Sequence, residues 1–301
     1  MIPTIVPLDA TLGAKVTDVN LKSLDEATWQ RIEKAFYDYA VLLFPGQHLN
    51  EDEQNAFGRR FGDLSIEARP ISNATPDGGV LGPDSHRYWI LRGNEHWHHD
   101  SSFMPVAAKA SLLTAKVLPS SGGETEWVDT RAAYEALDEP SRKRLEGLRA
   151  CHSIYYSHAQ LGQSARTGDM GGFHAYGAPV RPLVKPHPVT ARKALYTGRH
   201  AYAIEGLSAA ESARLLADVI EAACQSPRTY KHHWQLGDLV VWDNLCVMHR
   251  VWPYDYRETR IMMHTRIAGH PETEYAPTVA DPRADAYEPL DFETWRERAG
   301  V

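Results

Sequence analysis

The residues best suited to metal binding or catalysis lie in the stretch His96–Asp100, which reads H-W-H-H-D. Side chains two apart on a strand project from one face, so His98 and Asp100 could bind one ion, and His96 would share their face. One further ligand would complete the facial triad of non-haem iron oxygenases, which leaves positions open for a co-substrate and oxygen. A lone H-x-D pair is more often a surface pair or a hydrogen-bonded pair, so this stretch alone leaves both interpretations open.

His249 is the candidate for the missing ligand. It follows the apolar run Leu239–Trp242 and a polar turn at Asp243-Asn244, so a buried strand leads the chain toward it. Arg260 opens a second buried strand and needs an anionic partner there, because an unpaired buried charge is costly. A dicarboxylate co-substrate or a structural Asp or Glu would each serve, and spacing alone does not choose between them.

The elements that must position these residues are mostly short strands, with helices on the flanks. Extended segments or strands are predicted over 5–19, 41–44, 110–118, 238–242 and 260–267. Helices are predicted over 24–39, 50–61, 130–137, 141–148, 208–224 and 292–298, and long loops over 71–93 and 155–180. Three capping boxes are predicted, at Ser23 with Glu26, Asn50 with Glu53 and Ser208 with Glu211. This pattern favours a mainly β sandwich or barrel with covering helices.

Composition excludes several classes of protein. The 301 residues are 43% hydrophobic and 24% charged, which is the normal globular range. A net charge of −7 argues against nucleic-acid binding, and no apolar run of about 18 residues predicts a membrane span. Three scattered cysteines and an N-terminus without signal-peptide character predict a cytoplasmic protein with reduced thiols.

Several motifs together resemble the taurine dioxygenase and 2,4-dichlorophenoxyacetate dioxygenase family. Its W-H-x-D-x-S/T-F motif matches residues 97–103, and its G-G-x-T-x-W/F motif matches residues 122–127. Its G-D-x-x-x-W-D-N-x-x-x-x-H motif matches residues 237–249, and the arginine that follows corresponds to Arg260. Residues 44–47, 129–137 and 198–201 further resemble the aryloxyalkanoate branch of the family.

The resemblance implies a fold and a set of ligands. The fold would be a double-stranded β-helix, or jelly roll, forming one catalytic domain over residues 1–270 with a C-terminal extension over 271–301. His98, Asp100 and His249 would bind Fe(II), and O2 would react there. Thr125 and Arg260 would bind the distal carboxylate of the co-substrate 2-oxoglutarate.

The resemblance also implies a small anionic substrate. In the family a second arginine, four residues after the first, meets the substrate's anionic group. Here that position is His264, with Arg266 two residues further on, which looks like the (S)-2-aryloxypropionate dioxygenases. Such an acid would be hydroxylated and cleaved through a hemiacetal, with release of succinate and CO2. The predicted substrate-binding residues are Asn94, Phe103, Tyr155, Tyr156, His200, His264 and Arg266, although aromatic residues are more often buried for packing.

Three alternatives stay open at this point. The same chemistry could act on a sulfonate, an alkyl sulfate or an amino-acid-like acid. The protein could also be a metal-binding jelly roll without turnover, or a zinc hydrolase on a similar scaffold. By resemblance we expect a homo-oligomer, a dimer or a tetramer.

Overall fold

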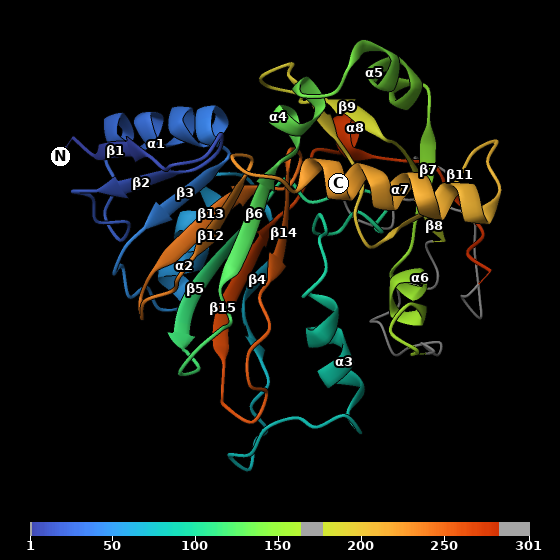
Figure 1. Cartoon of the computed structure of the whole chain (residues 1–301). Coiled ribbons are helices and arrows are strands. Elements are labelled where there is room, and N and C mark those ends of the chain that lie inside the picture. The colour runs from blue at the N-terminus through green and yellow to red at the C-terminus, as the bar shows by residue number, and fades with distance from the viewer. Residues whose placement is uncertain (1, 164–176, 283–301) are drawn as a thin grey trace.

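Two facing sheets form the core of the computed structural model, which describes residues 2–163 and 177–282. The larger sheet has seven strands in the order β1-β2-β3-β13-β5-β15-β4, and the smaller sheet has the order β12-β6-β14 (Figure 1). The larger sheet contains β1 (Thr4–Pro7), β2 (Ala14–Thr17), β3 (Val41–Phe44), β13 (Leu239–Asp243), β5 (Ala110–Val117), β15 (Ile261–Ile267) and β4 (Leu64–Ser72). The smaller contains β12 (Thr229–His232), β6 (Thr125–Asp129) and β14 (Val247–Val251). Neighbouring strands pair antiparallel except β2 and β3, so the predicted mainly β jelly roll is confirmed.

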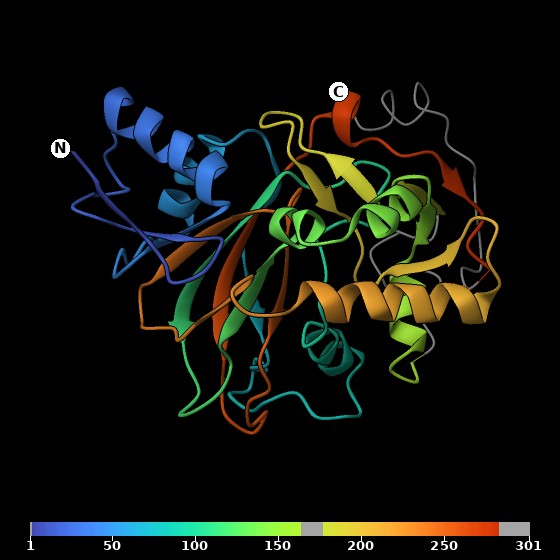
Figure 2. The same cartoon turned by 45° about the horizontal axis from the view of Figure 1, so that its top comes forward.

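Helices and smaller sheets surround this core (Figure 2). The helices are α1 (Glu26–Tyr39), α2 (Glu51–Arg59), α3 (His86–Gly93), α4 (Thr130–Glu135), α5 (Glu139–Glu146), α6 (Ile154–Ala159), α7 (Ala209–Ala223) and α8 (Pro271–Glu274). A four-stranded sheet contains β11 (Ala201–Ile204), β7 (Arg149–His152), β8 (Ala178–Pro182) and β16 (Thr278–Val279), and β10 (Lys193–Leu195) pairs with β9 (Val184–Pro186). Among the described residues, no helix combines the length and the apolar character needed to cross a membrane.

The central strands of the larger sheet are buried on both faces, which explains their continuous apolar runs. In β3, Leu42 and Phe44 pack in one cluster with α1 and α2. Val41 and Leu43 pack in another cluster with Trp127 of the smaller sheet. Strands β5 and β13 alternate in the same way, because successive side chains on a strand point to opposite faces. The larger sheet is therefore the middle layer between helices and the smaller sheet.

Most of the predicted elements are present, but one helix begins differently. The capping boxes predicted at Asn50 and Ser208 are confirmed as the starts of α2 and α7. The box predicted at Ser23 is wrong, because Asp25 caps α1 by accepting from the Thr28 backbone N–H at 2.7 Å. Asp25 competes successfully since a carboxylate caps as well as a hydroxyl.

Two predicted loops contain regular structure. The segment 71–93 includes the end of β4 and all of α3, because its Gly and Pro signals are confined to residues 76–83. The segment 155–180 includes most of α6 and the start of β8, and its residues 164–176 lie outside the described part of the chain. The helix predicted over 292–298 also lies outside the described residues. The domain boundary at residue 270 stays a prediction, although β16 pairs with β8 beyond it.

We expect Leu112→Ala to destabilise the protein by about 2–5 kcal/mol, because it leaves a cavity at a fully buried position of β5. Urea denaturation measures the free energy of unfolding. Val6→Ala, at a side chain 52% exposed on the edge strand β1, is the control and should change stability by less than about 0.5 kcal/mol. Equal effects of the two substitutions would contradict the layer arrangement.

Candidate metal centre and its pocket

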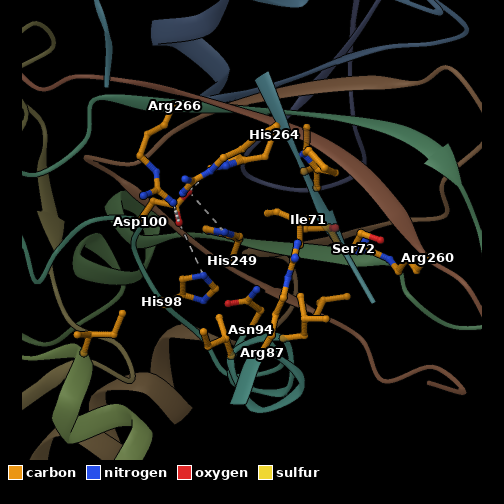
Figure 3. A pocket seen from close by; sticks show the side chains of 18 of the residues that line it. Ile71, Ser72, Arg87, Asn94, His98, Asp100, His249, Arg260, His264 and Arg266 are labelled. Carbon is orange, nitrogen blue, oxygen red and sulfur yellow. Dashed lines mark hydrogen bonds and ion pairs between the residues drawn. The ribbon is translucent and has the colours of Figure 1, made fainter. Parts of the chain in front are cut away.

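The three predicted metal ligands come from two segments that the fold pairs directly. His98 lies opposite His249 of β14 in an isolated antiparallel bridge, and each backbone N–H donates to the other residue's carbonyl, at 3.1 and 2.9 Å. The Nε2 atoms of both rings lie 4.0 Å from carboxylate oxygens of Asp100. All three ligand atoms lie within 4.8 Å of one another, so one ion could contact all three side chains (Figure 3).

The segment that leads to Asp100 is not the strand predicted from its spacing. Only His98 forms a bridge, and a turn follows in which Ser101 has a φ of 56°. His96 is exposed and does not share the face of the ligands. His99 is buried and stacks on Tyr196 with ring centroids 4.3 Å apart. A single bridge and a turn, rather than strand alternation, bring His98 and Asp100 together.

The protonation states of the two histidines suit a divalent cation. Nδ1 of His98 lies 2.8 Å from the carbonyl oxygen of His96, so this nitrogen donates and leaves the Nε2 lone pair facing Asp100. Burial lowers the pKa of His98 well below its ordinary value and lowers the pKa of His249 to about 4. Two neutral imidazoles and a carboxylate, without a thiolate, form a donor set that fits Fe(II) better than structural zinc.

Asp100 is held ionised and oriented by its neighbours. Arg266 Nη2 donates to Oδ1 at 2.9 Å, Ser111 Oγ donates to Oδ2 at 2.6 Å, and His264 Nε2 lies 3.6 Å from Oδ2. Burial alone would raise the pKa of this carboxyl, but the positive charge of Arg266 and the imidazoles of His249 and His264 hold it well below its usual range. Partners of this kind fix the orientation of a ligating carboxylate.

The W-D-N stretch is linked to Asp100 by a chain of hydrogen bonds through Ser111. Trp242 Nε1 donates to Asn244 Oδ1 at 2.8 Å, and Asn244 Nδ2 donates to Ser111 Oγ at 2.9 Å. Ser111 in turn donates to the carboxylate ligand. Asp243 Oδ1 accepts from the backbone N–H of Leu245 at 3.0 Å, so an Asx turn forms at the polar turn predicted for Asp243-Asn244.

Thr125 and Arg260 are buried in another part of the same cavity. The Nε and Nη2 atoms of Arg260 donate to the carbonyl oxygen of Gly123 at 3.2 and 2.9 Å, and Thr125 Oγ1 accepts from Trp234 Nε1 at 3.0 Å. Within residues 2–163 and 177–282, no carboxylate lies within ion-pair distance of Arg260. Gly123 has a φ of 73°, and a Cβ there would lie 3.0 Å from Arg260 Nε, so only glycine suits this position.

One cavity of about 780 Å³ is lined by the candidate metal ligands and by Arg260. Figure 3 shows Arg260 on the side of the cavity away from Asp100. Of the predicted substrate residues, those that line the cavity are Asn94, Phe103, His200, His264 and Arg266. Tyr155 and Tyr156 are not brought into the lining, since Tyr155 is buried outside it and Tyr156 stacks on Tyr202 with centroids 4.8 Å apart. Ile154 and His158 line the cavity instead, because residues four apart share one face of α6.

Several residues of the cavity wall were not predicted from the sequence. They are Arg69, Ile71, Arg87, Ile90, Leu91 and Arg199. Most of them belong to α3 or to the end of β4, within or beside the segment predicted as a loop. Arg199 adjoins His200 in the G-R-H-A stretch, and its charge within an otherwise small and aromatic segment was the signal that could have identified it.

A jelly roll that brings a His, Asp, His centre and a buried arginine into one cavity defines the class of 2-oxoglutarate-dependent non-haem iron dioxygenases. A family model described as "Taurine catabolism dioxygenase TauD, TfdA family" matches residues 4–266. The chain belongs to this family, as the motifs predict.

Similar proteins agree with this assignment. An (S)-phenoxypropionate/alpha-ketoglutarate-dioxygenase of Sphingobium herbicidovorans is 50% identical over 279 residues, which cover 90% of this chain and 97% of that one. One of the same description from Delftia acidovorans is 45% identical over 287 residues, 91% of this chain and 98% of that one. The crystal structure of AAD-2 in complex with Mn(II) and N-oxalylglycine is 38% identical, with a TM-score of 0.85 over 93% of this chain and 100% of that chain.

We expect Arg266→Gln to weaken binding of a divalent metal about 10–100-fold, because Asp100 loses the charge that orients it. Anaerobic titration with Fe(II) or Mn(II) measures this affinity. Arg59→Gln is a matched control, since Arg59 is exposed on α2 and paired with Glu67. Unchanged metal affinity together with a lost response to substrate would instead assign Arg266 to the substrate, as the sequence predicted.

Proposed function

We propose that this protein is an Fe(II)- and 2-oxoglutarate-dependent dioxygenase that hydroxylates a small aryloxyalkanoate-like acid. The observation that carries the proposal is the buried guanidinium of Arg260, which has no carboxylate partner in the described chain and shares a cavity with the candidate metal ligands. A buried charge without a counter-ion is unfavourable, and a keto-diacid supplies the missing carboxylate.

Each residue then has a defined share in the reaction. His98, Asp100 and His249 hold the metal, while the Thr125 hydroxyl and the Arg260 guanidinium bind the distal carboxylate of 2-oxoglutarate. When bound, the iron supplies the oxygen activation that couples decarboxylation of 2-oxoglutarate to succinate and CO2 with hydroxylation of a C–H bond. The protein selects that bond by holding it close to the metal.

The aryloxyalkanoate class is supported by the cavity wall and by the similar proteins. Apolar side chains that suit an aromatic ring line the cavity: Ile66, Ile71, Ile90, Leu91, Phe103 and Leu113. Asn94 and His200 add polar groups to this wall. Hydroxylation of the carbon that bears the ether oxygen yields a hemiacetal, which separates into a phenol or alcohol and a carbonyl acid. The predicted homo-oligomer and the cytoplasmic location stay predictions.

An anaerobic absorbance titration tests the function directly. Fe(II) and 2-oxoglutarate together should produce a metal-to-ligand charge-transfer band, and an aryloxy acid that enters the cavity should perturb it. Succinate release in air, measured with aryloxy acids, sulfonates, alkyl sulfates and amino-acid-like acids, then ranks the substrates. Binding of both cofactors without any stimulated succinate release would favour a protein without turnover, and activity with zinc in the absence of oxygen would favour a hydrolase.

We expect Arg260→Gln to weaken 2-oxoglutarate binding about tenfold or more, because it removes a charge-assisted hydrogen bond in a buried site. The charge-transfer band measures this affinity. Metal affinity measured without 2-oxoglutarate should be unchanged, since Arg260 contacts none of the three ligands. If the variant keeps full affinity for 2-oxoglutarate, the assignment of Arg260 is wrong.

A further inference from the structure

The five arginines that line the cavity differ in what already compensates their charge. They are Arg69, Arg87, Arg199, Arg260 and Arg266. Arg266 is paired with Asp100 at 2.9 Å and donates to Ser101 Oγ at 3.0 Å, and Arg260 is assigned to 2-oxoglutarate. Arg69 and Arg87 are exposed, so water solvates them. Arg199 is partly buried, and it has neither a carboxylate partner in the described chain nor the exposure of Arg69 and Arg87.

Arg199 packs against Gly93 of α3, and its guanidinium forms a long hydrogen bond with Ser157 of α6. Its Nη2 donates to Ser157 Oγ at 3.3 Å, and no carboxylate of the described chain lies within ion-pair distance of it. Burial lowers the pKa of Arg199 to about 10, so the guanidinium still carries its charge at neutral pH. A partly buried cation of this kind is stabilised when an anion joins it.

The surrounding backbone fixes Arg199 beside the metal centre. Its backbone N–H donates to the carbonyl oxygen of Trp97 at 2.8 Å, directly before the ligand His98. A Cβ at Gly198 would lie 3.1 Å from the Cα of His98, so the two segments are in close contact. The guanidinium packs against Gly93 at the end of α3, where a Cβ would lie 2.0 Å from Nη1. The position of the charge is therefore built into the fold.

We propose that Arg199 binds the carboxylate of the substrate, in place of the His264 and Arg266 pair. The inference rests on the proposed function, in which two carboxylate compounds enter one cavity. Two arginines of that cavity have no carboxylate partner in the described chain and are not exposed, the buried Arg260 and the partly buried Arg199, one for each compound. A planar guanidinium can bind a carboxylate by two parallel hydrogen bonds. His264 and Arg266 face Asp100 and act as positioning residues for that ligand.

The test compares an aryloxy acid with its primary amide in the wild type and in Arg199→Gln. The wild type should prefer the acid, and the variant should lose this preference, with KM for the acid rising about tenfold or more and KM for the amide unchanged. KM for 2-oxoglutarate and the charge-transfer band without substrate should not change. Arg199→Lys should keep part of the preference, and Arg59→Gln should keep all of it.

Gly93→Ala provides an independent variant that leaves Arg199 in the sequence. Gly93 has ordinary helical geometry, so the backbone accepts alanine, but the new methyl group would overlap the guanidinium. We expect Gly93→Ala to reduce the preference for the acid in the same direction as Arg199→Gln. Thermal denaturation of both variants shows whether they are folded when the kinetics are measured.

Two results separate failure of this inference from failure of the proposed function. If folded Arg199→Gln keeps the preference for the acid while Arg266→Gln loses it at saturating metal, the inference is overturned and the proposed function stands. If no aryloxy acid perturbs the charge-transfer band of the wild type, the proposed substrate class fails, and the same variants are compared with whichever carboxylate, sulfonate or sulfate does perturb it. A panel in which no anion perturbs the band overturns the inference as well.

Discussion

The two backbone hydrogen bonds between His98 and His249 are the contact on which the candidate metal centre depends, because they join proposed ligands far apart in sequence. The pairing register of β14 with β6 relates this contact to Thr125, a proposed residue of the co-substrate site. In the smaller sheet, His249 lies opposite Trp127 and Val251 lies opposite Thr125. Thr125 and Trp127 are two apart on β6, so they share the face that looks onto the larger sheet. A slip of one residue in β6 would turn Thr125 away from the cavity.

Burial of charge is the second constraint. The buried arginines outside the cavity show how this fold compensates such a charge. Arg131 is fully buried and bonds both carboxylate oxygens of Asp129. Arg181 is also buried and donates to four backbone carbonyls. The charges of Arg131 and Arg181 are thus compensated by hydrogen-bond partners, as general energetics requires. The buried Arg260 and the partly buried Arg199 differ from these two arginines, and both line the cavity, which agrees with the proposal that an anionic ligand completes each site.

The parts of this site that could be predicted from sequence were those where local chemistry is specific. His98, Asp100 and His249 stand in dense motifs, and the capping pairs at Asn50 and Ser208 depend only on residues three apart. The bridge that replaces the predicted strand could not be foreseen, because it depends on pairing with a distant segment.

The cavity wall was predicted least well, for a related reason. Tyr155 and Tyr156 are aromatic and lie in a plausible segment, yet the rotation of a short helix decides which of its residues face the metal. Ile154 and His158 occupy that face, and only the packing of α6 reveals it. Arg69 and Arg87 likewise depend on where β4 and α3 pass the cavity. Periodicity reports that a helix or strand has a buried face, but not which cavity that face meets.

Glycines connect these observations, because Arg260 and Arg199 each pack against one. Gly123 has a positive φ and touches Arg260, so its identity is dictated by backbone conformation and by contact together. Gly93 lies in ordinary helix, where alanine is the better helix former, and the atoms nearest to a Cβ there belong to the guanidinium of Arg199. A glycine kept at a cost to helix stability is explained if the charge it admits has a use. The positions of these two charges in the cavity therefore depend on Gly93 and Gly123, which leave space for the guanidinium groups, as well as on the arginines themselves.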